Sequence, residues 1–176
     1  MTERQKFHVV QKFKNFELRT YEPCIVAEVE MSEGYRAATQ GAFRYLFNYI
    51  SRGNGASASI SMTAPVLATT QNTLDSKDWK VSFVMPTGST LSELPLPSDT
   101  RVTLREIPAE NCVALAFRGW ATKSLSQHKE DVLRASAHEE LISLSQETRI
   151  CRFDPPFKPG FMQYNEIVIP TNTSSM

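Results

Sequence analysis

The chain has 176 residues, of which 41% are hydrophobic and 22% are charged, a composition that is typical of a globular domain and argues against a disordered or fibrous chain. Its 19 Lys and Arg residues balance its 19 Asp and Glu residues, so no net field would attract a phosphate backbone, and nucleic-acid binding is disfavoured. No segment approaches membrane-spanning length and residues 1–14 lack the apolar stretch of a signal peptide, so we predict one cytoplasmic domain over residues 1–176.

About eight stretches along the chain have the alternating or continuous apolar pattern of β-strands. They are residues 16–21, 24–31, 59–68, 80–85, 102–106, 112–117, 150–153 and 164–169. Two segments with helical spacing, residues 35–50 and 125–144, interrupt the strands. The order strand, strand, helix, strand, strand therefore occurs twice.

Faint sequence similarity between the two halves supports a duplication. The pair Leu-Arg at 18–19 recurs at 104–105, and the pair Val-Ala at 26–27 recurs at 113–114, so the offsets are 104 minus 18, or 86, and 113 minus 26, or 87. We predict an α+β fold with pseudo-twofold halves at roughly residues 14–90 and 100–170. Two helices would pack on a curved antiparallel sheet or distorted barrel.

The second helix is expected to begin at a capping box formed by Ser124 and Gln127. Its apolar positions form a stripe that should face the core: Leu133, Ala137, Leu141 and Leu144. Its charged positions should face water: Lys129, Glu130, Arg134 and Glu139.

The remaining segments are expected to be surface connections. Residues 85–100 contain three prolines and form a long loop, which is either a solvated connection or a lid over a ligand. Residues 171–176 form a polar, frayed tail. Cys24, Cys112 and Cys151 are odd in number and widely spaced, which predicts reduced thiols rather than a disulfide or metal framework.

Four segments resemble the SOUL haem-binding protein family and occur in the order that the family shows. They are YEPCIVAEVE at 21–30, ISMTAPV at 60–66, WKVSFVMP at 79–86 and FDPPFKPGFMQYNEIVIP at 153–170. The resemblance covers nearly the whole chain and implies two βαββ-type repeats in a distorted barrel. It also implies a haem or other tetrapyrrole over an apolar face of the first helix, with basic side chains near the propionates. The expected function is that of a tetrapyrrole carrier or buffer.

The first helix carries apolar residues on two faces. At about 100° per residue, six positions gather into a sector that should face the sheet: Tyr35, Ala38, Ala42, Tyr45, Leu46 and Tyr49. Phe43 and Phe47 fall outside this sector, near Arg36 and Gln40, and their i to i+4 spacing lets their rings form one platform for a flat apolar ligand. Alternatively, the proline-containing loop or a second subunit covers them.

The resemblance extends to polar positions around this platform. Lys158 matches a lysine in the corresponding loop of haem-binding relatives and could pair with a propionate, and Met162 in the same segment is assigned to the site. Gln40 and Asn48 stand where those relatives have basic residues, so we expect Arg36 or Arg44 to substitute for them. His8, His128 and His138 lie outside the matched motifs, and the sequence predicts no metal site.

Two other functions remain open at this stage. An effector-binding or hydrolase-like domain could use Glu166 as an acid/base group with Tyr164 or Tyr49, although no nucleophile motif accompanies them. A buried Glu166 would need a compensating partner. An interaction module or homodimer could instead use Phe43 and Phe47 as its contact.

Overall fold

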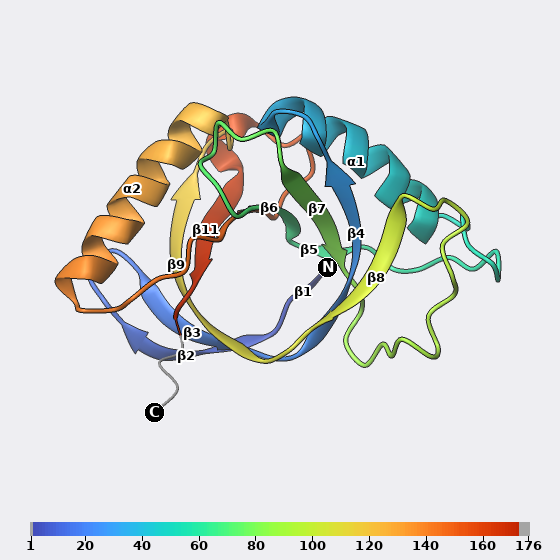
Figure 1. Ribbon diagram of the computed structural model, residues 1–176, viewed down its shortest axis with the longest axis horizontal. Helices are drawn as coiled ribbons and strands as arrows, with labels where there is room; N and C mark the ends of the chain where they lie inside the picture. The colour runs from blue at the N-terminus through green and yellow to red at the C-terminus, as the bar shows by residue number, and fades with distance from the viewer. Residues whose placement is uncertain (1, 173–176) are drawn as a thin grey trace.

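A nine-stranded antiparallel sheet curls into a half-barrel, with two helices on its outer side (Figure 1). The computed structural model describes residues 2–172, and the α+β class predicted from the sequence is confirmed. The strands of the sheet, in chain order, are β2 (Phe7–Lys12), β3 (Glu17–Tyr21), β4 (Cys24–Met31), β6 (Val66–Thr70), β7 (Trp79–Val84), β8 (Val102–Ile107), β9 (Glu110–Arg118), β10 (Thr148–Arg152) and β11 (Tyr164–Pro170). A separate parallel pair consists of β1 (Glu3–Arg4) and β5 (Thr63–Ala64). The helices are α1 (Tyr35–Ile50), α2 (Lys123–Glu139) and a short 3₁₀ helix, η1 (Gly160–Met162).

The sheet order reveals how the two halves combine. The order is β2-β3-β9-β11-β10-β6-β7-β4-β8, so β6 and β10 meet at the centre. The first strand of each half pairs with the other half: β3 lies beside β9, and β8 lies beside β4. This exchange makes the two sides of the sheet equivalent and accounts for the repeated pattern in the sequence.

The sequence located most elements but missed the strands β1 and β2 and the short helix η1. The helix at 35–50 has the predicted bounds, and β4 matches residues 24–31. The strand expected at 59–68 is divided, because Pro65 lies between β5 and β6. Strands β1 and β2 were not predicted, because every residue in them is exposed and no alternation between core and solvent marks them.

The second helix departs from its prediction at both ends. Its N-cap is Thr122, whose hydroxyl accepts a hydrogen bond from the Leu125 N–H at 3.2 Å, so the capping box at Ser124 is wrong. The helix ends at Glu139, where Ile142 N–H bonds to the Ala137 carbonyl, and Leu141 beyond it is 92% exposed. Within the helix the inward stripe therefore stops at Ala137, whereas Leu144 lies beyond the helix and still packs against the same core.

One charged residue of α2 also differs from expectation. Glu130 was expected to face water but is buried, with only 8% of its surface exposed. Its carboxylate pairs with Arg134 at 3.1 Å one turn later, and Arg134 also donates to the Ser145 carbonyl. The buried carboxylate is thus paired, as a charge in that position must be.

The curled sheet has two chemically different faces. Helix α1 packs on β4, β7 and β8, and α2 packs on β9 and β11, so apolar cores fill the space between helices and sheet. The inner face combines a smaller apolar cluster with buried charges. Arg19 and Glu166 pair at its centre, and Glu28 accepts from Ser82 and Arg105.

The long loop and the C-terminal tail both form hydrogen bonds with the rest of the fold. The 85–100 loop lies beside the end of α1, where the Tyr49 hydroxyl donates to the Pro95 carbonyl at 2.7 Å. Thr171, expected to be frayed, donates its N–H to the Asn111 carbonyl at 2.9 Å, and residues 173–176 of the expected tail lie outside the described residues.

All three cysteines are free, with Cys112 and Cys151 buried. Neither helix in the described chain is long and apolar enough to cross a membrane.

Candidate ligand-binding site

The rings of Phe43 and Phe47 project from one flank of α1 into solvent. Their exposed fractions are 40% and 51%, their ring centroids lie 5.9 Å apart and the ring planes differ by only 12°. Phe43 also meets the buried ring of Phe83 on β7 edge-on, at 5.4 Å between centroids. The i to i+4 spacing predicted this pair, and Phe83 anchors it against the sheet. We call Phe43 and Phe47 the aromatic shelf.

The sheet beside the aromatic shelf carries an arginine that the sequence did not single out. Phe83 on β7 pairs with Val66 on β6, and Val66 pairs with Arg152 on β10. Directly paired residues project to the same face of a sheet, so these three side chains form a row under the flank of α1. Two strand spacings separate Phe83 from Arg152, or about 10 Å. No pattern within one strand could have linked Arg152 to α1.

Arg152 is half-buried. Its charge opposes the burial that raises the pKa of Tyr35 to about 12. The row from Phe83 to Arg152 is therefore apolar at one end and cationic at the other. This arrangement suits a flat ligand with an anionic edge.

The predicted polar residues of α1 divide between two sides of the helix. Arg36, Gln40 and Arg44 are exposed on its solvent side. Asn48 instead lies toward β8, where it lines a shallow pocket of about 440 Å³. The other residues lining that pocket are Tyr45, Tyr49, Gly53 and Ser98 to Arg101. Asn48 is thus on the opposite flank from the Phe43–Phe83 contact.

Lys158 and Met162 lie in the segment that joins β10 to β11. This segment follows Arg152 directly and so begins at the same end of the sheet as Phe83. Lys158 pairs with Asp154 at 2.9 Å, and the Met162 carbonyl accepts a hydrogen bond from Arg118 at 2.9 Å. A propionate that paired with Lys158 would have to compete with Asp154.

Glu166, the candidate acid/base group, lies on the inner face and is 3% exposed. Arg19 donates to both of its carboxylate oxygens, at 2.9 and 2.7 Å, and the Tyr164 hydroxyl donates to one of them at 2.7 Å. Burial and the hydrogen bond to Glu166 raise the pKa of Tyr164 to about 12. Tyr164 and Glu166 are therefore brought together, whereas Tyr49 bonds to Pro95 on the other side of the sheet. The bidentate pairing gives Glu166 the compensating partner that its burial requires.

The three histidines lie away from the aromatic shelf. His8 is on β2, and His128 and His138 are exposed on α2. Within residues 2–172, no three His, Cys, Asp or Glu side chains gather into a group that could hold a metal ion.

Comparisons with known proteins agree on the family and on the fold. The family described as SOUL heme-binding protein matches residues 2–170. Heme-binding protein 1 of Xenopus laevis is 26% identical over 157 residues, which cover 86% of this chain and 81% of that protein. The crystal structure of the EcmrR C-terminal domain shares the fold with a TM-score of 0.70 at 13% identity, covering 89% of this chain and 96% of that one. A hydrolase from Listeria innocua shares it with a TM-score of 0.61 at 14% identity, covering 92% and 94%.

Proposed function

This chain belongs to the SOUL heme-binding protein family, and from that premise we propose that it carries or buffers haem or another tetrapyrrole on the aromatic shelf of α1. The observation that carries the proposal is the pair of near-parallel, exposed rings of Phe43 and Phe47. A flat apolar ligand laid on these rings would remove them from water. The name of the Xenopus laevis relative supports the same ligand class.

Apolar burial would supply most of the affinity. Each Å² of apolar surface removed from water contributes about 25 cal/mol, so two partly exposed phenyl rings and a porphyrin face provide a substantial favourable term. The contact of Phe43 with Phe83 holds one ring in place before the ligand arrives, which lowers the entropy lost on binding. Haem, when bound, supplies its redox-active iron, while this chain supplies the apolar surface and the charges at its edge.

We propose that the acidic edge of a tetrapyrrole pairs with one of three arginines. Arg152 ends the row that begins at Phe83, and Arg36 and Arg44 lie on the exposed side of α1. Guanidinium groups bind carboxylates through paired hydrogen bonds, so a propionate is a suitable partner for any of them. We propose that Arg152 is the principal partner, because the row connects it with the aromatic contact.

A haemin titration tests the proposal. Purified wild-type protein should shift the Soret band and quench tryptophan fluorescence at micromolar haemin. Replacing both shelf residues, Phe43→Ala and Phe47→Ala, should weaken binding about tenfold or more, because the rings lose their apolar contact with the porphyrin. Leu96→Ala is the matched control, since Leu96 is 75% exposed in the 85–100 loop.

Equal affinities of the wild-type and the double variant would contradict the proposal. Measuring the molar mass of both proteins by size-exclusion chromatography with light scattering, with and without haemin, separates the ligand shelf from a homodimer contact. If the double variant has a lower molar mass than the wild-type protein both with and without haemin, the shelf is an interface between copies of this chain.

A further inference from the structure

The inner face of the half-barrel is crossed by the segment Glu3 to Lys6. Figure 1 shows β1 on the inner side of the curl. Strand β1 pairs with β5, the Gln5 N–H donates to the Ala64 carbonyl at 2.9 Å, and the Glu3 carboxylate accepts from the Thr87 N–H at 2.7 Å. Both residues of β1 are exposed, so little apolar burial holds the segment in place.

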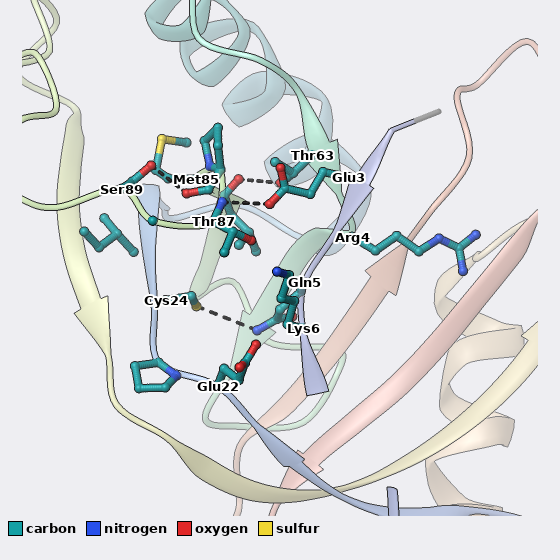
Figure 2. A pocket seen from close by; sticks show the side chains of 15 residues that line it. Glu3, Arg4, Gln5, Lys6, Glu22, Cys24, Thr63, Met85, Thr87 and Ser89 are labelled. Atoms are coloured by element: carbon teal, nitrogen blue, oxygen red, sulfur yellow. Dashed lines mark hydrogen bonds between the residues drawn. The ribbon is translucent and has the colours of Figure 1, made fainter. Parts of the chain in front are cut away.

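This segment separates two pockets. Figure 2 shows the first, in which Glu3 and Gln5 face Thr87 and Cys24. Arg4 points away from the other labelled side chains, on the opposite side of β1 (Figure 2). The second pocket, of about 80 Å³, is lined by residues that include Arg4, the rings of Phe153 and Tyr164, and the paired Arg19 and Glu166.

The Arg4 guanidinium lies over two aromatic rings at once. Its central carbon is 5.0 Å from the centroid of Phe153 and 5.6 Å from the centroid of Tyr164. The two rings meet edge to face, with centroids 5.1 Å apart and planes at 67°, so they form two walls of one recess. A delocalised cation gains affinity from ring faces at such distances. Arg118 also lies over the Tyr164 ring, at 5.3 Å, which shows that this ring accepts guanidinium groups.

The charges below the recess are already balanced in pairs. Glu166 is paired with Arg19, and Asp154 is paired with Lys158. The Tyr164 N–H also donates to Asp154 at 2.7 Å. A cation in the recess therefore meets aromatic faces and a carboxylate that Arg19 already neutralises, so its affinity must come mainly from the ring faces.

We propose that this recess is a binding site for a planar organic cation of the guanidinium or amidinium class, and that Arg4 occupies it as an internal competitor. Release of the segment Glu3 to Lys6 breaks one short strand pairing and a few exposed hydrogen bonds, so an external cation can replace Arg4 at modest cost. Release also joins the two pockets that flank β1. The site lies on the inner face and is separate from the aromatic shelf on α1.

Titration with phenylguanidinium by isothermal calorimetry tests this site. Arg4→Ala removes the internal competitor, so it should bind the probe about tenfold more tightly than the wild-type protein. Lys77→Ala, which removes an exposed cation elsewhere, should bind like the wild-type protein. In the Arg4→Ala background, Phe153→Leu should remove most of the gain, because one wall of the recess is lost.

The source of the cation is decided by a second probe. The blocked tripeptide Ala-Arg-Ala offers the same guanidinium on a polypeptide. If the Arg4→Ala protein binds this peptide more tightly than phenylguanidinium, the occupant is an arginine side chain. Tighter binding of phenylguanidinium would identify a small molecule. Equal binding of phenylguanidinium by wild-type and Arg4→Ala protein would overturn the proposal. Haemin affinity should be unchanged in Arg4→Ala, so failure here is distinguishable from failure of tetrapyrrole binding.

Discussion

The exposure and position of a side chain define a candidate site more than its residue type does, as Phe43, Phe47 and Arg152 show. The chain has ten phenylalanines, but Phe43 and Phe47 are the stacked pair that projects from a helix, and Phe83 holds one of them. Arg152 is an ordinary strand residue in the sequence. It becomes a candidate because two ladder pairings place it in the same row as Phe83, which contacts Phe43.

Removing the charge at Arg152 should selectively weaken the binding of a dicarboxylic porphyrin. We expect Arg152→Gln to lower haemin affinity about threefold, the size of a partly exposed ion pair. Fluorescence titration with protoporphyrin IX and with its dimethyl ester provides the measurement. The ester has no carboxylates, so it should bind both proteins equally.

Arg101→Gln is the matched control for Arg152→Gln. Arg101 lies on the Asn48 flank of α1, where its guanidinium is 4.6 Å from the ring centroid of Tyr45. A loss of affinity in Arg101→Gln but not in Arg152→Gln would place the acidic edge of the ligand on that flank and contradict our assignment.

At the scale of elements, the two helices occupy equivalent places in the repeat but present different surfaces. Helix α1 places its apolar residues both against the sheet and in water. Helix α2 has a narrow buried stripe and a side-chain cap at Thr122. The two halves therefore share one scaffold, while α1 alone of the two long helices carries an exposed aromatic pair.

The cap at Thr122 predicts a stability difference between two neighbouring hydroxyl residues. Thr122→Ala should lower the free energy of unfolding by about 1 kcal/mol, because the Leu125 N–H loses its acceptor. Ser124→Ala, inside the first turn, should change it by less than about 0.5 kcal/mol. Urea denaturation followed by circular dichroism measures both. A larger effect at Ser124 would restore the capping box expected from the sequence.

For the molecule as a whole, the curl of the sheet separates an outer surface from an inner one. The outer surface carries the helices and the aromatic shelf, and the inner surface carries the Arg19–Glu166 pair and the recess occupied by Arg4. Each face is assembled from strands of both halves, because β3 and β8 exchange partners between the halves. Changes in the stability of the sheet should therefore affect both candidate sites.

Buried thiols predict that the whole fold weakens at alkaline pH. Burial raises the pKa of Cys112 from 9.0 to about 12 and raises that of Cys151 as well. Between pH 9.0 and about 12 the Cys112 thiol keeps its proton in the native protein but has lost it in the unfolded chain. The free energy of unfolding should therefore fall as the pH rises above about 9. The loss is about 1.4 kcal/mol per pH unit for each such thiol.

Denaturation of the wild-type protein and Cys112→Ala between about pH 7 and pH 10.5 measures this dependence. The free energy of unfolding of the variant should fall less steeply with pH than that of the wild-type protein, whatever the stability of the variant at neutral pH. Parallel curves would show that Cys112 does not contribute to the pH dependence.

Features that depend on local periodicity could be predicted from the sequence. The bounds of α1, strands such as β4, the repeated element order and the outward direction of Phe43 and Phe47 follow from spacing along one segment, and the structure agrees with them. Local patterns gave wrong predictions where the exposure of a residue differs from what its residue type leads one to expect. The exposed strands β1 and β2, the buried Glu130 and the early end of α2 are such cases.

Contacts between residues that are distant in the sequence became known only from the folded chain. Arg19 and Glu166 are 147 positions apart, and Arg152 joins the row that contains Phe83 only through the pairing of β10 with β6 and of β6 with β7. Arg4 lies over Phe153 and Tyr164 because β1 pairs with β5 on the inner face of the curl. Such contacts depend on strand order and register, which arise from the packing of the whole sheet and leave no signal within a single segment.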